Sequence, residues 1–348
     1  MSRLSAMNLG SRRELFVDTH HDDDGSPGVC IGRGVPAIRI SVAALFLLFT
    51  GCVAAWDPFG QVAGRPAQEA APASVSTALP EDAWTVVGAS QGSATLDVSG
   101  ETEDTRGIDF KSDGTMLYVV GRRSANVAAY ALEAPWNLTS ATFVDTFEEI
   151  GRNLPGREAQ GSVAHGLFLR KCDGRKMFVW NRTESFAYDL ATPWDVTTAV
   201  PTGYQSFAGI VQRGHDIEFK PDGTRFYVDD RDAGAVYQFE LATPWDITTA
   251  DLAYTLDISD WQQQVRGIQF SPDGRRFFIL DTVLSSITEF RLENAWDLDG
   301  AEKYATFDVQ RSDPRAVTWR PDGRMFFVTE RDGGVIHSYH AGEGKTER

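Results

Sequence analysis

Five basic or titratable side chains recur at one position when the chain is aligned on a repeated Asp-Gly dipeptide. Four of them align directly, and the fifth, a histidine, aligns if its repeat carries one inserted residue. We call these residues the collar: Arg106, His165, His215, Arg266 and Arg315. Because guanidinium groups match the geometry of carboxylate and phosphate, the collar predicts a binding site for an anionic ligand.

A second column of arginines lies at the end of the following strand-like run, namely Arg122, Arg182, Arg231 and Arg331, with Thr282 in the fourth repeat. The position before it carries Gly121, Asn181, Asp230, Asp281 and Glu330. These acids open an alternative: each collar arginine can face the acid that ends the neighbouring strand and form a girdle of salt bridges. The ligand site and the girdle are compatible with each other.

Polar residues also interrupt the apolar run that follows the collar, at Asp109, Glu218, Gln269 and Thr318. Asp109 and Glu218 can in principle serve as the paired carboxylates of a glycosidase, but their repeats are not neighbours. The chain has no Gly-x-Ser-x-Gly, no His-Glu-x-x-His, no phosphate loop and no dinucleotide fingerprint. The sequence therefore predicts no metal and no cofactor, and catalysis by this pair stays an alternative.

Five repeats of about 50 residues position these columns, each built around an Asp-Gly dipeptide at 113–114, 173–174, 222–223, 273–274 and 322–323. Each dipeptide joins two β-patterned runs, as in RGIQFSPDGRRFFIL, and predicts a hairpin. A third run contains Tyr130, Tyr188, Phe239, Phe290 or Tyr339. A turn with Trp136, Trp194, Trp245 or Trp296 then leads to a fourth run. We interpret the tryptophans as structural wedges and Asp195 and Asp246 as turn caps, with a ligand-binding aromatic ring as the alternative.

The last repeat stops after its third run, at His340, and its missing strand lies at the other end of the domain. Residues 81–84 and 94–98 echo 293–296 and 305–309. This offset predicts a closed ring, in which the first strand completes the last sheet. The fold class is therefore all-β: one five-bladed β-propeller of four-stranded blades over residues 81–340, followed by a disordered tail at 341–348.

The repeats resemble the YVTN-type and WD-repeat-like blades of β-propellers, and the TPWDITTA segment resembles those of bacterial and phage propellers. They differ from true WD repeats in their longer period and in the Trp-Asp pair, which falls after a proline. The resemblance implies that the collar and the second arginine column lie on the top face, around the channel mouth. The segments 148–163 and 261–264 are then expected to overhang this site.

The N-terminal region predicts export. The apolar run 40–51 has the length of a signal-peptide core, and Phe49-Thr50-Gly51-Cys52 resembles a bacterial lipobox, in which Cys52 becomes lipidated. Cleavage after residue 55 and an uncleaved anchor reaching Trp56 are the alternatives. Residues 1–34 are unusual for a leader, so we hypothesise a misassigned start and a true start at Val35. Residues 53–80 read as a flexible tether rich in alanine and proline.

The net charge of −16 argues against a nucleic-acid partner. Cys172 is the sole cysteine after Cys52, so the sequence predicts no disulfide inside the propeller. Taken together, we expect a monomeric, periplasmic or cell-surface lipoprotein that binds a small anion, a glycan or a protein and touches the membrane only through its lipid. The alternatives are a periplasmic hydrolase or lactonase-like enzyme and a purely structural envelope scaffold.

Overall fold

The computed structural model describes residues 83–154 and 163–342, which form five four-stranded antiparallel sheets. Blade 1 contains β2 (Thr105–Phe110), β3 (Met116–Gly121), β4 (Asn126–Leu132) and β5 (Ala141–Phe147). Blade 2 contains β6 (Gly166–Leu169), β7 (Lys176–Asn181), β8 (Glu184–Leu190) and β9 (Ala199–Ser206). Blade 3 contains β10 (Gly214–Phe219), β11 (Arg225–Asp230), β12 (Ala235–Leu241) and β13 (Ala250–Asp257). Blade 4 contains β14 (Val265–Phe270), β15 (Arg276–Asp281), β16 (Ser286–Arg291) and β17 (Glu302–Asp308).

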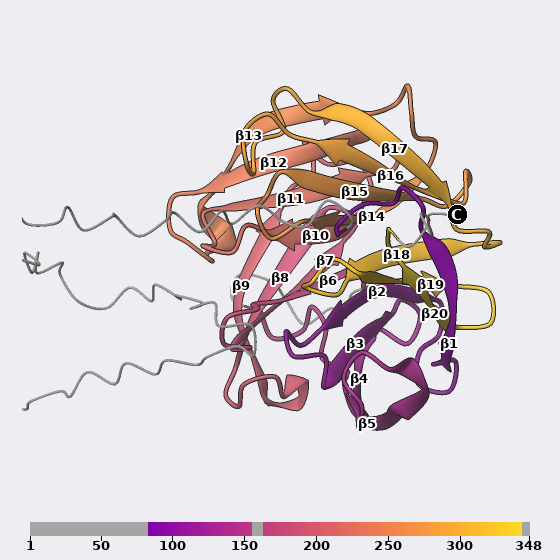
Figure 1. Cartoon of the computed structure of the whole chain (residues 1–348). Helices are drawn as coiled ribbons and strands as arrows, with labels where there is room; N and C mark the ends of the chain where they lie inside the picture. The colour runs from indigo at the N-terminus through magenta and orange to yellow at the C-terminus, as the bar shows by residue number, and fades with distance from the viewer. Residues whose placement is uncertain (1–82, 155–162, 343–348) are drawn as a thin grey trace, which may run out of the picture. The chain divides into compact units, whose positions relative to one another are not determined.

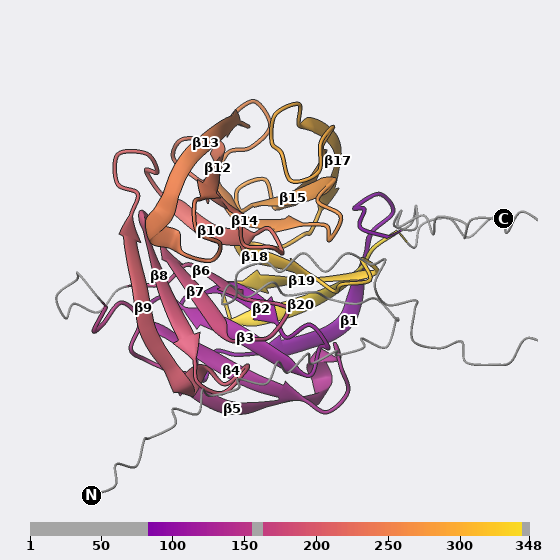
Figure 2. The ribbon, with the colours of Figure 1, turned by 90° about the vertical axis from the view of Figure 1, so that its left-hand side faces the viewer.

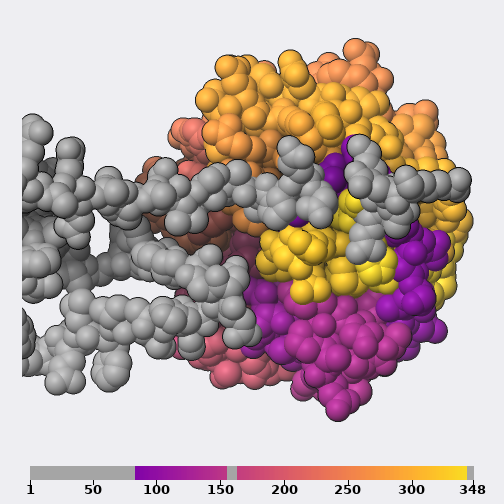
Figure 3. Space-filling view, viewed as in Figure 1, coloured from indigo at the N-terminus to yellow at the C-terminus, as the bar shows by residue number. Residues whose placement is uncertain are grey.

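Blade 5 combines the two ends of the domain: β18 (Pro314–Trp319), β19 (Met325–Glu330), β20 (Val335–His340) and the first strand, β1 (Ser90–Asp97). β1 pairs antiparallel with β20, with Leu96 opposite Ile336. The indigo β1 lies beside the yellow β20 in both ribbon views (Figures 1 and 2), and indigo atoms lie against yellow ones on the surface (Figure 3). The predicted split blade, and with it the five-bladed propeller, is confirmed.

The innermost strands contact one another in the order β2, β6, β10, β14, β18 and back to β2, which closes the ring. Five apolar clusters fill the space between the blades, and each draws its residues from two neighbouring sheets. Phe168 and Phe178 of blade 2, for example, pack with Phe219 of blade 3. Burial of these faces is the main force that holds sheet against sheet.

Each Asp-Gly turn forms one unit with the tryptophan of its own blade. Gly223 has a φ of +71°, and a Cβ placed there would lie 2.3 Å from Cε2 of Trp245. The Trp245 backbone N–H donates to the Gly223 carbonyl at 3.0 Å, and Trp245 itself has a φ of +65°. A bulky residue in the left-handed region is an outlier that surrounding contacts must hold in place. The indole also packs on Phe168 and Phe178 of the preceding blade, so the tryptophans are structural wedges.

Three short 3-10 helices follow the Trp turns: η2 (Leu138–Ser140), η3 (Val196–Thr198) and η4 (Ile247–Thr249). Asp195 and Asp246 cap η3 and η4 by accepting the backbone N–H groups of Thr197 and Thr248, both at 3.1 Å. The prediction that these acids are turn caps is confirmed. Their carboxylates fix the start of each outermost strand.

Cys172 is disulfide-bonded, and the two other cysteines, Cys30 and Cys52, lie outside the described residues. The bond therefore does not join two cysteines of the propeller. The leader 1–52 with its start at Val35, the tether 53–80 and most of the tail 341–348 also lie outside the described residues. Within 83–154 and 163–342 the model has no helix long and apolar enough to span a membrane.

Candidate functional site

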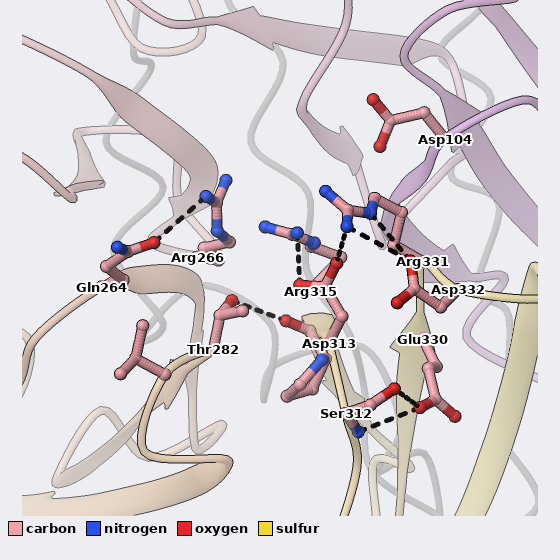
Figure 4. Close-up of polar contacts among 12 residues, drawn as sticks. Asp104, Gln264, Arg266, Thr282, Ser312, Asp313, Arg315, Glu330, Arg331 and Asp332 are labelled. Carbon is pink, nitrogen blue, oxygen red and sulfur yellow. Dashed lines mark hydrogen bonds and ion pairs between the residues drawn. The ribbon is translucent and has the colours of Figure 1, made fainter.

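The collar residues come together at the start of the innermost strands. Arg106, His215, Arg266 and Arg315 lie on β2, β10, β14 and β18, and His165 directly precedes β6. All five are buried, with exposed fractions between 4% and 8%. The imidazole rings of His165 and His215 meet edge to face at 4.9 Å, and Nη1 of Arg266 lies 2.6 Å from Nε2 of His215. Figure 4 shows the guanidinium groups of Arg266 and Arg315 beside Arg331.

His165 reaches the collar because blade 2 carries the inserted residue that the alignment required. The insertion lies in its Asp-Gly turn: the Gly174 N–H donates to Arg170, four residues back, whereas the Gly114 N–H donates to Lys111, three residues back. β2, β10, β14 and β18 each have a register shift at the collar, and β6 has none. Blade 2 therefore differs in structure from the other four blades, and it supplies His165 to the collar.

Two collar arginines form salt bridges, but not with the predicted acids. Arg106 pairs with Asp104 at 2.6 Å, and Arg315 pairs with Asp313. Each acid also binds an arginine of the second column, Arg122 at 2.8 Å for Asp104 and Arg331 at 2.6 Å for Asp313. The girdle is thus partial, and its acids lie two residues before the arginine. The sequence signal was the Asp-x-Arg spacing at 104–106 and 313–315.

The acids at the strand ends hold the loops instead. Asp281 accepts backbone N–H groups of Gln263 and Gln264 on one oxygen and of Val283 and Leu284 on the other. Asp230 likewise joins a crossing loop to a turn: it accepts the N–H group of residue 212 on one oxygen and those of residues 213, 232 and 233 on the other. Glu330 accepts the Ser312 N–H at 3.0 Å and contacts His337. These carboxylates tie each crossing loop to the turn beside it, and the prediction that they face the collar arginines is wrong.

Arg266 differs from the other two arginines because Gln264 takes the place of the acid. Its Nη2 reaches Gln264 Oε1 only at 3.5 Å, and no carboxylate pairs with Arg266 anywhere in residues 83–154 and 163–342. Burial, followed by repulsion from Arg315 and Arg106, lowers the pKa of Arg266 to about 9. Burial and Arg315 likewise lower the pKa of Arg106 to about 10, although Asp104 opposes them. Three like charges are therefore held close together.

Many donors of the collar are unused. Nε and Nη1 of both Arg106 and Arg315, and Nε of Arg266, have no hydrogen-bond partner within the described ranges. Nδ1 of His165 and of His215 is also unpartnered there. Burial and then the nearby arginines lower the pKa of His165 to about 2 and that of His215 well below its usual value, so both rings are neutral at pH 7. Buried polar atoms without partners cost stability, which makes them candidates for ligand contacts.

The second arginine column lies on the turns between the middle strands. Arg182 occupies a two-residue turn with a φ of +35°, a strained value for a side-chain-bearing residue. Partial burial and the positive charges of Arg122 and Arg213 lower the pKa of Arg182. These arginines therefore repel one another electrostatically. Arg231 lies 3.7 Å from Asp232. In blade 4 Thr282 takes this place and donates to the Pro314 carbonyl at 2.7 Å.

Asp109 of the alternative catalytic pair has structural contacts. Its carboxylate accepts the N–H groups of Phe110 and Leu169, both at 2.8 Å, and forms an ion pair with Lys171. Asp109 thereby joins β2 to β6. Glu218 is half-buried, and burial raises its pKa well above the usual value, with Lys171 opposing and Asp109 adding to the shift. Asp109 thus pairs with Lys171, a contact that the sequence did not predict, and Lys171 acts on Glu218 through its charge.

A second pair of buried carboxyl groups was missed. Asp216 replaces the small residue that follows the collar in the other blades (Gly107, Gly166, Gly267 and Ala316). Asp229, which is fully buried, accepts the N–H groups of His215 at 2.9 Å and Asp216 at 2.6 Å. Burial raises the pKa of Asp229 to about 7, and burial and Asp229 raise that of Asp216 well above its usual value. The signals were the charged residues in GHDIEF and FYVDD.

The expected overhanging loops are described only in part. Residues 148–154 pack inward through Ile150 and Leu154, and residues 155–162 lie outside the described ranges. Gln262 also points inward and donates to Thr288 at 2.8 Å, whereas Trp261 is 37% exposed. A pocket of about 520 Å³ opens away from the collar, between β5 and the η3–β9 segment, and is lined by Asp145, Glu148 and Glu149 among others. The described residues contain no group of three or more potential metal ligands.

No protein-family model and no curated protein matches this chain. Solved structures do match. They include a protein from Lactobacillus plantarum (14% identity, TM-score 0.43) and a proposed 6-phosphogluconolactonase from Bacteroides uniformis (15%, 0.42). A third is a functionally unknown protein from Desulfotomaculum acetoxidans (13%, 0.39).

These matches cover 65–66% of this chain and 63–64% of the other chains, so the chain spans less than two thirds of their length.

Proposed function

We propose that this protein is a binding module that holds a small anion, bearing a carboxylate or phosphate group, at the collar. The observation that carries the proposal is Arg266, a buried arginine that pairs with no acid among the described residues and whose pKa is lowered by burial and by two like-charged neighbours. Around it, within the described residues, Arg106, Arg122, Arg315 and Arg331 pair with Asp104 and Asp313, and Arg331 also pairs with Asp332. A cation-rich group in a chain of net charge −16 favours a specific anion over general attraction of anions.

The ligand would replace the missing carboxylate. Two-pronged contacts from guanidinium groups suit planar carboxylates and phosphates, and the unused N–H groups of Arg106 and Arg315 supply further donors. The neutral histidines supply a hydrogen bond that depends on the tautomer. A glycan or a protein partner would have to bring an acidic group to the same place. No contact among the described residues favours the hydrolase or scaffold alternatives.

Calorimetric titration of the full-length protein at low ionic strength, with sulfate, phosphate and citrate as probes, tests the proposal. Arg266→Gln should weaken binding of whichever probe binds at least tenfold. The matched control is Arg275→Gln, because Arg275 lies on the same blade but on the Asp-Gly turn, where it donates to the Glu293 carbonyl. Equal affinity in wild type and Arg266→Gln, or equal loss in both variants, would contradict the proposal.

We also propose that the module is exported and anchored through a lipid on Cys52, which would hold the propeller as a monomer outside the membrane. Lipidation and the disulfide of Cys172 are mutually exclusive, because the lipid uses the Cys52 thiol and cleavage before Cys52 removes Cys30. The support is the apolar run 40–51 that ends in Thr50-Gly51-Cys52. Cys52→Ser should move the protein from the detergent phase to the aqueous phase in cell fractionation. An unchanged detergent-phase fraction would contradict lipidation.

A further inference from the structure

The rim around the collar is asymmetric. On the turn of blade 4, Val283 and Leu284 are 52% and 40% exposed. The equivalent turns carry Arg123-Ser124 in blade 1, Asp232-Ala233 in blade 3 and Asp332-Gly333 in blade 5. Blade 4 thus replaces both the arginine of the second column, by Thr282, and the polar turn that follows it. Exposed apolar residues grouped at one place on a surface commonly mark a binding site.

The neighbouring crossing loops extend this apolar sector. Trp261, in the loop that enters blade 4, is 37% exposed and packs edge to face on Phe290 at 5.8 Å. Ile210 is the equivalent residue in the loop that enters blade 3 and is 39% exposed. The loop that enters blade 1 carries Glu101 at this position, and the loop that enters blade 5 is two residues shorter. The apolar sector therefore spans the entrances of blades 3 and 4.

The apolar sector coincides with the half of the collar in which no acid forms a salt bridge with a collar side chain among the described residues. Blades 3 and 4 contribute His215 and Arg266, whereas the acids Asp104 and Asp313 belong to the side of blades 1 and 5. An anion drawn to Arg266 therefore has apolar surface beside it. On the opposite side it would meet carboxylates.

The buried carboxylate of Asp281 connects Arg266 to the exposed apolar turn of blade 4. Asp281 binds Gln264, whose side chain contacts Arg266, and on its other oxygen it binds the N–H groups of Val283 and Leu284, both at 2.8 Å. Figure 4 shows Gln264 and Thr282 below Arg266. The exposed apolar turn is thus fixed close to the unpaired arginine.

We infer that the ligand class is an amphiphilic organic anion, with a carboxylate on Arg266 and an aliphatic chain over Trp261, Val283 and Leu284. The inference rests on the proposed function of the collar and specifies its ligand. The charge pattern sets the orientation, since the acids of blades 1 and 5 repel the head group and favour the side of Arg266. Burial of the chain on the apolar sector adds affinity with each methylene.

Calorimetry of the full-length protein with acetate, butyrate, hexanoate and octanoate tests this inference. Affinity should rise about two- to fourfold per added methylene, because each is partly or fully buried. In the double variant Val283→Asn/Leu284→Asn, acetate should bind as in wild type and the dependence on chain length should disappear. The control Val144→Asn/Val200→Asn removes equally exposed apolar residues from β5 and β9 and should retain the dependence.

The outcomes separate the two proposals. Acetate binding that Arg266→Gln abolishes, with no gain for longer chains, would overturn the amphiphilic ligand and leave the anion site standing. Octanoate binding that neither Arg266→Gln nor the double variant weakens would be non-specific and would also overturn the inference. Failure of every carboxylate and inorganic anion to bind would overturn the proposed function itself.

Discussion

Arg266→Gln should stabilise the ligand-free protein, although it removes a buried side chain that contacts its neighbours. The pKa of Arg266 is lowered to about 9 by burial and by two arginines, well below the pKa of an exposed arginine. At about 1.4 kcal/mol per pH unit, the charge costs roughly 5 kcal/mol of folding free energy. The substitution also removes packing and the contact with His215, which should cost about 2 kcal/mol of stability. The net effect is therefore a stabilisation of about 3 kcal/mol.

The sign follows from proton linkage. Between about pH 9 and the pKa of the unfolded chain, the unfolded state binds more protons than the folded state, so stability rises with pH across that window. Below about pH 9 the cost is fully present, and a measurement at pH 7 therefore sees all of it. Bound anion should cancel much of the cost in wild type and none of it in Arg266→Gln.

The assay is urea denaturation at pH 7 and low ionic strength, with and without the anion that binds. Arg315→Gln is the matched comparison, because Arg315 lies in the same ring but pairs with Asp313. That variant leaves a buried acid with Arg331 alone and should lose about 1–3 kcal/mol. If Arg266→Gln unfolds more easily than wild type, like Arg315→Gln, the repulsion argument is refuted and the collar is a structural girdle throughout.

Three further variants test the fold and its buried charges. Asp229→Asn should flatten the dependence of stability on pH. In wild type the pKa of Asp229 is raised to about 7 in the folded state, so the protein loses about 4 kcal/mol of folding stability as the pH rises from 4 to 7. If urea denaturation at pH 5 and pH 8 gives the variant the same stability difference as wild type, this prediction is contradicted. Gly223→Ala should lower folding stability by about 3 kcal/mol or more, since its Cβ would clash with Trp245. The control Gly209→Ala, at a φ of +100° with open space around it, should lower stability by only about 1–2 kcal/mol. Equal melting temperatures of the two variants would refute the Gly–Trp unit. A chain that starts at residue 100 lacks β1 and should not show a cooperative melt, and a wild-type transition would refute closure by the first strand.

The architecture was predictable because it depends on local sequence motifs that repeat along the chain. Each Asp-Gly turn requires a glycine at positive φ, and the echo of residues 293–309 in 81–98 locates the split blade without any knowledge of contacts. The collar was predictable for the same reason, since residues at one offset from the turn start neighbouring strands. Even the insertion in blade 2 could be inferred from the position of His165.

The pairing of charges was not predictable from columns alone. The partners of Arg106 and Arg315 lie in the crossing loops, where the repeats differ most in sequence, and the acids at the strand ends cap loop N–H groups instead. The buried pair of Asp216 and Asp229 breaks the repeat, and an alignment that looks for shared residues passes over such exceptions. The three departures at Gln264, Thr282 and Asp216 all lie beside Arg266 or His215, where repeated structure gives way to what we propose is a binding site.

Crystals soaked in selenate would test the central claim most directly, because the anion can be located by its anomalous scattering. We predict a peak bonded to Arg266 and to the free N–H groups of Arg106 or Arg315, and no such peak in crystals of Arg266→Gln. A collar without selenate, in which the three guanidinium groups have found other partners within the chain, would contradict the account.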